Sequence, residues 1–117
     1  ELEKSQWLNY ISNLLTAALQ VQHTMIISNQ SCLIHCSDGW DRTSQLCALT
    51  KLISDPFYRT LTGFKILIET DFIYYGHKLA DRNGVFGGIK DENERSPIFL
   101  QFLDCVFQII CLKNEKL

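Results

Sequence analysis

The residues from Cys36 to Arg42 combine a potential nucleophile with a potential anion clamp. The Cys36 thiol and the Arg42 guanidinium stand six positions apart, around a stretch of small and turn-prone residues. The apolar run 32–35 before them is typical of a buried strand, and the apolar spacing over residues 44–53 is typical of a helix. The sequence therefore predicts a loop between the end of a strand and the N-terminus of a helix.

Such a loop can hold a phosphate group without a metal ion. Its successive backbone N–H groups converge on one point, and the positive end of the following helix adds to them. Arg42 can bind two phosphate oxygens through its planar guanidinium. The same surroundings are expected to lower the pKa of the Cys36 thiol, and the thiolate is the form that attacks. We therefore expect in-line displacement at phosphorus through a cysteinyl-phosphate intermediate.

The alkoxide that leaves in this reaction needs a proton. A carboxyl group within hydrogen-bond reach is the usual donor, and the loop contains two, Asp38 and Asp41. The residues alone leave both as candidates. We expect no metal and no organic cofactor, because Arg42 and the loop amides can supply the charge stabilisation.

The eight residues from Cys36 to Thr43, CSDGWDRT, resemble the active-site signature of the myotubularin family of phosphoinositide 3-phosphatases. The resemblance continues in the family's order from about Leu2 to Ile110. The further segments that match are residues 55–60, 63–64, 75–78 and 95–105. The resemblance implies that residues 1–117 are part of the family's catalytic domain, without its N-terminal half and its lipid-binding PH-GRAM module.

The resemblance also implies roles for the loop residues. Cys36 matches the nucleophile, Arg42 the phosphate clamp and Asp41 the general acid. The remaining matches would contact the substrate: Ser37, Asp38, Gly39, Trp40 and Thr43. Of these, Asp38 is expected to contact inositol hydroxyls, and the Thr43 hydroxyl to hydrogen-bond the cysteine sulfur. The Trp40 ring is either a stacking platform for the substrate or a wedge that holds the loop in shape.

Two basic residues downstream match positions that the family associates with a second, 5-position phosphate. They are Lys78 and Arg82, one helical turn apart. Relatives often carry arginine at the first position. A lysine is a point charge where arginine is a bidentate fork, so we expect doubly phosphorylated lipid to be held less well. Without the resemblance, the pair would be interpreted as an exposed helix face with favourable dipole placement.

The function implied is removal of the 3-phosphate from phosphatidylinositol 3-phosphate and phosphatidylinositol 3,5-bisphosphate. One alternative is a phosphoprotein phosphatase of tyrosine or dual specificity. Another is a non-catalytic interaction module, because the family has inactive members that bind active ones, and a homo- or hetero-oligomer with other myotubularin-like chains is possible on the same ground. Inactive members typically lose the nucleophile or the arginine, whereas this chain retains Cys36 and Arg42.

Composition bounds these hypotheses. A chain of 117 residues with 46% hydrophobic content forms one small domain at most. The net charge of −2 argues against nucleic acid as a partner, because such binding needs a concentrated basic surface. Five cysteines, an odd number with no Cys-x-x-Cys pair, favour a reducing compartment. We expect a cytoplasmic protein that binds its lipid peripherally at a membrane surface, and the resemblance implies endosomal membranes.

The expected fold class is α/β: a helix-rich fragment of a cysteine-dependent phosphatase domain, with the nucleophile strand, the phosphate-binding loop and the helices that follow. Periodicity predicts helices over residues 2–23, 43–53 and about 62–77, the last with a strand as an alternative. Residues 81–88 are turn-rich and predict a loop. Ser96 and Pro97 are typical of an N-cap and a first helical position. After them a helix is expected with an apolar stripe made of Phe99, Phe102, Leu103, Val106, Phe107 and Ile110.

Overall fold

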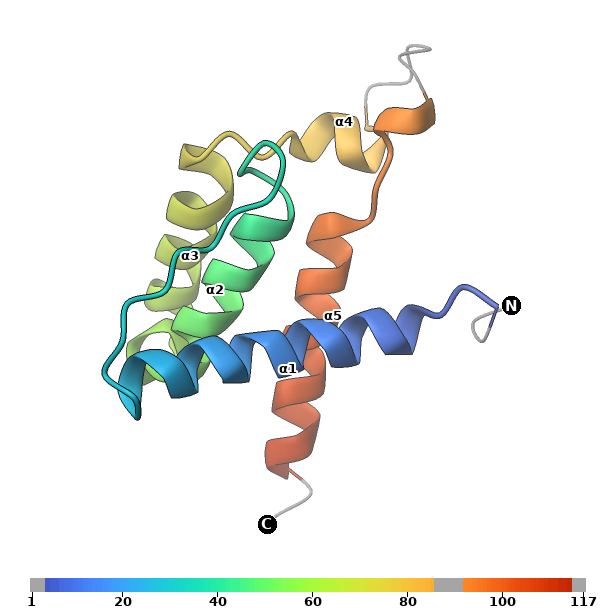
Figure 1. Ribbon diagram of the computed structural model, residues 1–117. Coiled ribbons are helices and arrows are strands. Elements are labelled where there is room, and N and C mark those ends of the chain that lie inside the picture. Colours follow the sequence, from blue (N-terminus) through green and yellow to red (C-terminus); the bar gives the residue numbers. More distant parts are fainter. Residues whose placement is uncertain (1–3, 86–91, 115–117) are drawn as a thin grey trace.

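The computed structural model describes residues 4–85 and 92–114, and the described part is built from helices (Figure 1). The α-helices are α1 (Trp7–Ile26), α2 (Arg42–Ser54), α3 (Leu61–Ile68), α4 (Leu79–Asn83) and α5 (Ile98–Asn114). Shorter elements are the 3-10 turns η1 (Pro56–Arg59) and η3 (Glu92–Glu94), and the π-helical segment η2 (Glu69–Tyr74), which continues α3. The expectation of a helix-rich fragment is confirmed.

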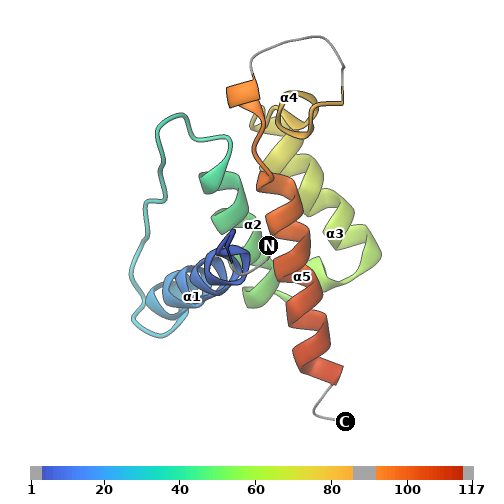
Figure 2. The same cartoon turned by 90° about the vertical axis from the view of Figure 1, so that its right-hand side faces the viewer.

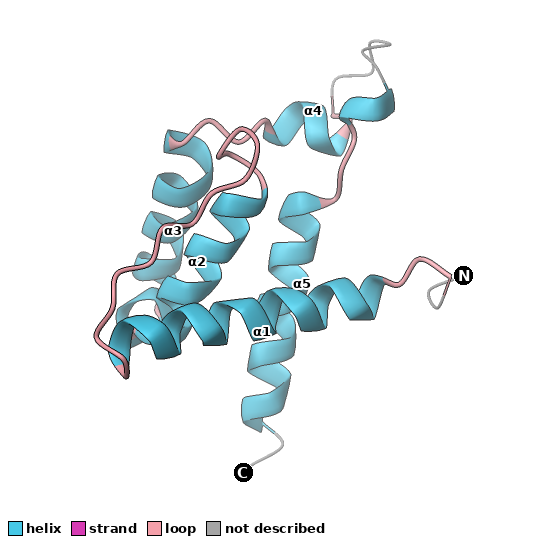
Figure 3. Cartoon of the chain, in the orientation of Figure 1, coloured by secondary structure: helices cyan, strands magenta, loops and turns pink. Residues whose placement is uncertain are grey.

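The predicted strand at residues 32–35 is wrong for this structure. The segment is irregular, and no strand occurs in residues 4–85 and 92–114 (Figure 3). Its side chains alternate as in an extended chain, since Cys32 and Ile34 are half-buried while Leu33 is 89% exposed. A strand requires a neighbour to accept and donate its backbone hydrogen bonds, and no described segment lies beside it as one. The α/β class is therefore not observed in the described residues.

Helix α1 begins and ends later than predicted, at Trp7 and Ile26 instead of about residues 2 and 23. Its apolar face packs against the other helices, since Ile11 and Ala18 are buried in the core. The Trp7 indole nitrogen donates a hydrogen bond of 2.6 Å to Asp104 Oδ2 and ties α1 to α5. Figures 1 and 2 together show α1 crossing α2 and α5.

Helix α2 lies at the centre of the packing, in contact with α1, α3, η2 and α5. The buried apolar residues gather around it: Ile11, Ala18, Ala48, Leu49, Leu52, Leu67, Phe72, Phe102 and Cys105. The rings of Phe72 and Phe102 lie 4.9 Å apart between η2 and α5. Because α2 starts immediately after the Cys36 to Asp41 loop, this core holds the C-terminal end of the loop in place.

The stretch from residue 61 to 74 is helical, so the strand alternative there is wrong. Thr60 caps α3, since its hydroxyl accepts a 3.0 Å hydrogen bond from the Gly63 N–H. Gly63 is required by packing, because a Cβ there would stand 2.0 Å from the Phe57 carbonyl oxygen. The loop predicted for residues 81–88 is wrong for its first part, because Asp81 to Asn83 belong to α4. Residues 86–88 lie outside the described residues.

Helix α5 begins at Ile98, and the Pro97 carbonyl accepts a hydrogen bond from the Gln101 N–H. Pro97 therefore precedes the helix instead of opening it. The predicted stripe is only partly buried: Phe102 is fully buried and Phe99 and Val106 are half-buried, but Leu103, Phe107 and Ile110 are exposed. The prediction failed because α5 carries apolar residues on all sides, and then periodicity does not reveal which face is buried.

Candidate active site

The loop from Cys36 to Asp41 turns back on itself so that backbone N–H groups face the cysteine sulfur. The Gly39 N–H donates a hydrogen bond of 3.2 Å to Cys36 Sγ. Gly39 has a φ of +86°, in the left-handed region that glycine adopts without steric cost. The loop then enters α2 at Arg42, so the first N–H groups of that helix point toward the loop.

These donors determine the ionisation of the nucleophile candidate. Burial by itself would raise the pKa of the Cys36 thiol. Hydrogen bonds from the Thr43 hydroxyl and from the N–H groups of Thr43, Gly39 and Asp38 outweigh that effect and lower the pKa from 9.0 to about 6. The Thr43 hydroxyl is buried and has no other hydrogen-bond partner among the described residues, so its proton is free to turn toward the cysteine sulfur. A thiol with this pKa is mostly thiolate at pH 7.

Arg42 lies on the same loop and is exposed. Its Nη2 donates a 3.2 Å hydrogen bond to Ser37 Oγ, which bridges the start of the loop and the start of α2. Ser37 Oγ also lies 3.4 Å from Asp38 Oδ2, and Asp38 is exposed. Ser37 thus links Arg42 and Asp38, and all three side chains are exposed at the loop.

Asp41 lies on the other side of the loop and is bound by two residues from distant segments. Its Oδ1 lies 2.8 Å from His77 Nδ1, and its Oδ2 accepts hydrogen bonds from Arg82 at 3.1 Å from Nε and 2.9 Å from Nη2. The side chain therefore makes no cap for α2, although Asp41 is the N-cap residue. Each carboxyl oxygen already accepts a hydrogen bond.

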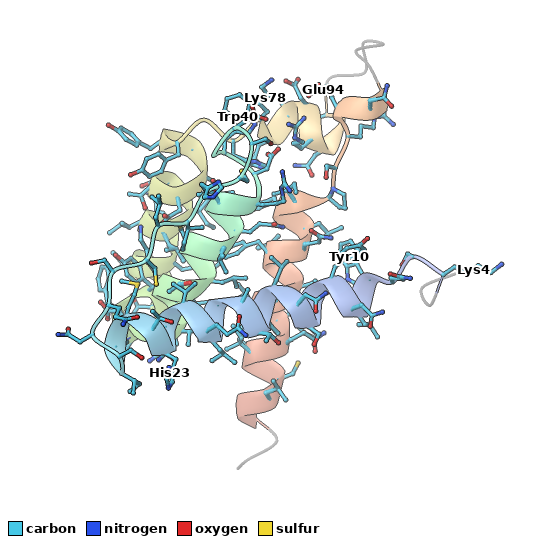
Figure 4. All side chains as sticks on the ribbon, viewed as in Figure 1. Lys4, Tyr10, His23, Trp40, Lys78 and Glu94 are labelled. Atoms are coloured by element: carbon cyan, nitrogen blue, oxygen red, sulfur yellow. The ribbon has the colours of Figure 1, made fainter. Side chains whose placement is uncertain are left out.

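Arg82, expected at a second phosphate, is engaged within the protein. Besides Asp41, its Nη1 contacts the carbonyl and carboxylate of Glu94, and the side chain is 12% exposed. Hydrogen bonds to Asp41 and Glu94 raise the pKa of Arg82, so it stays charged. Lys78 is exposed, and its ammonium lies 5.1 Å from the ring centroid of Trp40, within cation–π range. Figure 4 shows Trp40, Lys78 and Glu94 at the same end of the molecule.

The backbone carbonyl of Trp40 contacts two side chains. Its carbonyl accepts a 3.0 Å hydrogen bond from Ser44 Oγ and lies 3.0 Å from His77 Nδ1. Its ring is half-buried beneath Lys78. His77 and Glu94 are contacts that sequence reasoning missed. The Gly76-His77 pair could have indicated the first, whereas nothing in the sequence distinguishes Glu94 from other surface acids.

A cavity of about 280 Å³ lies beside the loop and is lined in part by Gly39, Thr43 and Cys47. Its lining also includes an ion pair, in which Lys51 Nζ lies 2.8 and 2.9 Å from the carboxylate oxygens of the buried Asp71. Burial raises the pKa of the Cys47 thiol, so it lacks the activation of Cys36. Cys105 on α5 is fully buried.

Two properties of the described residues concern metal ions and membranes. Within them, no group of three or more histidine, cysteine, aspartate or glutamate side chains is placed to hold a metal ion. No described helix is long and apolar enough to cross a membrane.

An activated thiol in a loop of N–H donors, followed by an arginine at a helix start, is the arrangement of a cysteine-dependent phosphatase loop. The chain belongs to the myotubularin-like phosphatase domain family, whose model matches residues 1–117. It is 49% identical to a Xenopus laevis protein named phosphatidylinositol-3,5-bisphosphate 3-phosphatase MTMR4 and 48% identical to the human protein of that name, each over 93% of this chain. It is 49% identical to mouse phosphatidylinositol-3,5-bisphosphate 3-phosphatase MTMR6 over 92% of this chain. The matches span only 10%, 9% and 17% of these relatives.

Proposed function

We propose that this chain supplies the catalytic loop of a phosphoinositide 3-phosphatase. The observation that supports this most strongly is the Cys36 thiol, whose pKa of about 6 comes from donors within its own loop. The N–H groups that surround this sulfur can also bind the oxygens of a phosphate group placed beside the thiolate. Relatives named as phosphatases of phosphatidylinositol 3,5-bisphosphate support an inositol lipid as the substrate over a phosphoprotein.

The proposed reaction begins with attack of the Cys36 sulfur on the 3-phosphate. A sulfur–phosphorus bond forms while the bond from phosphorus to the inositol oxygen breaks. Arg42 and the loop N–H groups hold the non-bridging oxygens, and Asp41 gives a proton to the leaving inositol oxygen. Water then gives a proton to the Asp41 carboxylate and attacks the phosphorus of the cysteinyl phosphate. The sulfur–phosphorus bond breaks, which releases inorganic phosphate and regenerates the Cys36 thiolate. Ser37, Asp38, Gly39, Trp40 and Thr43 shape the loop or contact the inositol.

Proton donation from Asp41 requires a change in the contacts described above. Both of its oxygens accept hydrogen bonds from His77 or Arg82, so one oxygen must be freed before it can carry a proton. We propose that substrate entry loosens the Arg82 contact. Asp38 is exposed and has no such constraint, which keeps it as the alternative acid.

We further propose that the protein acts in the cytoplasm, at the surface of membranes that contain the lipid, endosomal membranes among them. Lys78 and Arg82 stay candidates for the 5-phosphate of the bisphosphate. Sedimentation with vesicles that contain or lack phosphatidylinositol 3-phosphate would test membrane association. Light scattering would test assembly with further copies or with other myotubularin-like chains.

The deciding experiment measures phosphate release from vesicles of phosphatidylinositol 3-phosphate, with the longest natural product that contains this chain. Cys36→Ser should abolish turnover, because a hydroxyl is a far weaker nucleophile than a thiolate at neutral pH. Cys111→Ser, a thiol change on α5, is the matched control and should retain most activity. Turnover retained by the Cys36 variant would refute the mechanism, and release from a phosphotyrosine peptide alone would favour a phosphoprotein phosphatase.

A further inference from the structure

His77 connects the segment after η2 to the end of the loop. Its side chain is completely buried, although histidine usually reaches solvent. The ring packs edge-on against Phe72, with centroids 5.4 Å apart, and the His77 N–H donates to the Phe72 carbonyl at 2.9 Å. The position of the imidazole is therefore set by the core.

The contacts of the ring assign its proton. Nδ1 lies 3.0 Å from the Trp40 carbonyl oxygen and 2.8 Å from Asp41 Oδ1, and both atoms are acceptors. Nε2 is buried and has no hydrogen-bond partner among the described residues. A proton on Nε2 would thus face no acceptor, at the cost of an unpaired buried donor. The hydrogen-bond network therefore assigns the proton to Nδ1, where one N–H is shared by two loop oxygens.

His77 and Arg82 divide the carboxyl group of Asp41 between them. The shortest contact of Oδ1 is with His77, and those of Oδ2 are with Arg82. Arg82 alone would leave Oδ1 with a single long contact of 3.3 Å to Nε. The imidazole therefore restrains the carboxyl group and the backbone of the preceding residue together.

We propose that His77 is a positioning residue, which orients Asp41 and the end of the catalytic loop through its Nδ1–H without touching the substrate. Only the expected effect on kcat rests on the proposed function. The proton assignment and the coupling of His77 to Asp41 stand on the structure, and they can be tested in a protein of any activity.

Two variants of similar size distinguish the hydrogen-bonding role of the Nδ1–H from the packing role of the ring. In His77→Asn, the amide nitrogen takes a place close to that of Nδ1 and can still donate. In His77→Gln, the amide nitrogen lies near the place of Nε2, where the described residues provide no acceptor. We expect His77→Gln to lower kcat on phosphatidylinositol 3-phosphate by at least about tenfold with KM little changed, while His77→Asn retains most of kcat. Trp7→Phe removes a hydrogen bond far from the loop and should leave both constants unchanged.

A double-mutant cycle with Asp41→Ala tests the route of the effect. If His77 acts through Asp41, the two His77 variants should become equal once the carboxylate is gone. An equal loss of kcat in His77→Asn and His77→Gln would overturn the proposal. So would a loss of kcat in the double variants equal to the product of the losses in the single variants, because His77 would then act independently of Asp41. Thermal unfolding of each variant identifies any that fail to fold, and the comparison then uses His77→Asn against wild type.

The tautomer supplies a readout that needs no activity. Nitrogen NMR of labelled histidine distinguishes a proton on Nδ1 from one on Nε2, and we expect Nδ1–H, with a resonance that Asp41→Ala shifts. A proton on Nε2 would refute the assignment even in an active enzyme. If the wild type releases no phosphate but shows the coupled Nδ1–H, the proposed function fails while the structural role of His77 stands.

Discussion

Arg82 and Asp41 form an ion pair that joins α4 to the end of the Cys36 to Asp41 loop, with Nη2 and Nε of Arg82 at 2.9 and 3.1 Å from Asp41 Oδ2. The sequence suggests separate tasks for these two residues, proton donation and recognition of a second phosphate. The structure makes them partners. A change at either residue is therefore expected to affect the other.

The first prediction follows from the donors around Cys36. Alkylation of Cys36 should rise with pH around a midpoint of about 6, because only the thiolate reacts. Thr43→Val removes one hydrogen bond to the thiolate and should move the midpoint upward. Mass spectrometry of the modified peptides gives the profile for each cysteine. Cys105, whose pKa burial raises to about 12, is the internal control and should stay unmodified below pH 9. An unchanged midpoint in Thr43→Val would mean that the Thr43 hydroxyl does not lower the pKa of Cys36.

The second prediction separates the two carboxyl groups. If Asp41 is the general acid, Asp41→Asn should slow turnover of the inositol lipid at least about a hundredfold, yet affect an aryl phosphate with a low-pKa leaving group far less. Asp38→Asn should weaken lipid turnover without this dependence on the leaving group. The measurement is kcat for both variants on both substrates. The same loss on both substrates in Asp41→Asn would mean that Asp41 only shapes the loop.

A third prediction concerns Lys78 and Arg82. Lys78 is exposed, so Lys78→Ala should reduce turnover of the 3,5-bisphosphate at least about tenfold more than that of the 3-monophosphate. Arg82→Ala should reduce turnover of both lipids, because it also releases Asp41. Lys78→Arg should shift preference toward the bisphosphate, since a fork replaces a point charge. If Arg82→Ala affected the bisphosphate alone, its pairing with Asp41 would have no part in catalysis.

The fourth prediction concerns the ion pair beside the loop cavity. The Asp71 side chain is 4% exposed and that of Lys51 is 41% exposed, so the two partners are not equivalent. Lys51→Met leaves a buried carboxylate without a cation and should cost about 3 kcal/mol of unfolding free energy. Asp71→Asn leaves a lysine that can turn toward solvent and should cost about 1 kcal/mol.

Urea unfolding at pH 7 measures both costs of that ion pair. Hydrogen bonding to Asp71 raises the pKa of Lys51 above 10.5, against the opposing effect of burial. The stability that the pair contributes is therefore present in full below pH 10.5 and is lost as the pH rises through the folded pKa. Equal costs for the two variants would contradict the assigned asymmetry.

Contacts between residues close in the sequence could be predicted from the sequence alone. The Gly39 N–H and Cys36 Sγ are three residues apart, so the turn-prone loop itself brings them together. Helix α2 likewise lies within one residue of its predicted bounds, since its apolar spacing and the following Asp55 and Pro56 act over one or two turns. The family match over residues 1–117 agrees with the resemblance found in the octet.

Contacts between distant segments were decided by the tertiary structure alone. Asp41 meets His77 and Arg82 across 36 and 41 residues, and no local spacing encodes such a meeting. The buried face of α5 depends on its neighbours, which cover Phe102 and leave Phe107 exposed, although both are equally apolar. Residues 32–35 have the composition of a strand but lack a partner among the described segments, and a strand is completed only by hydrogen bonds from another chain segment. Sequence determined the chemistry available within the loop, and packing determined which distant side chains hold it, because burial and pairing are properties of segments brought together by the fold.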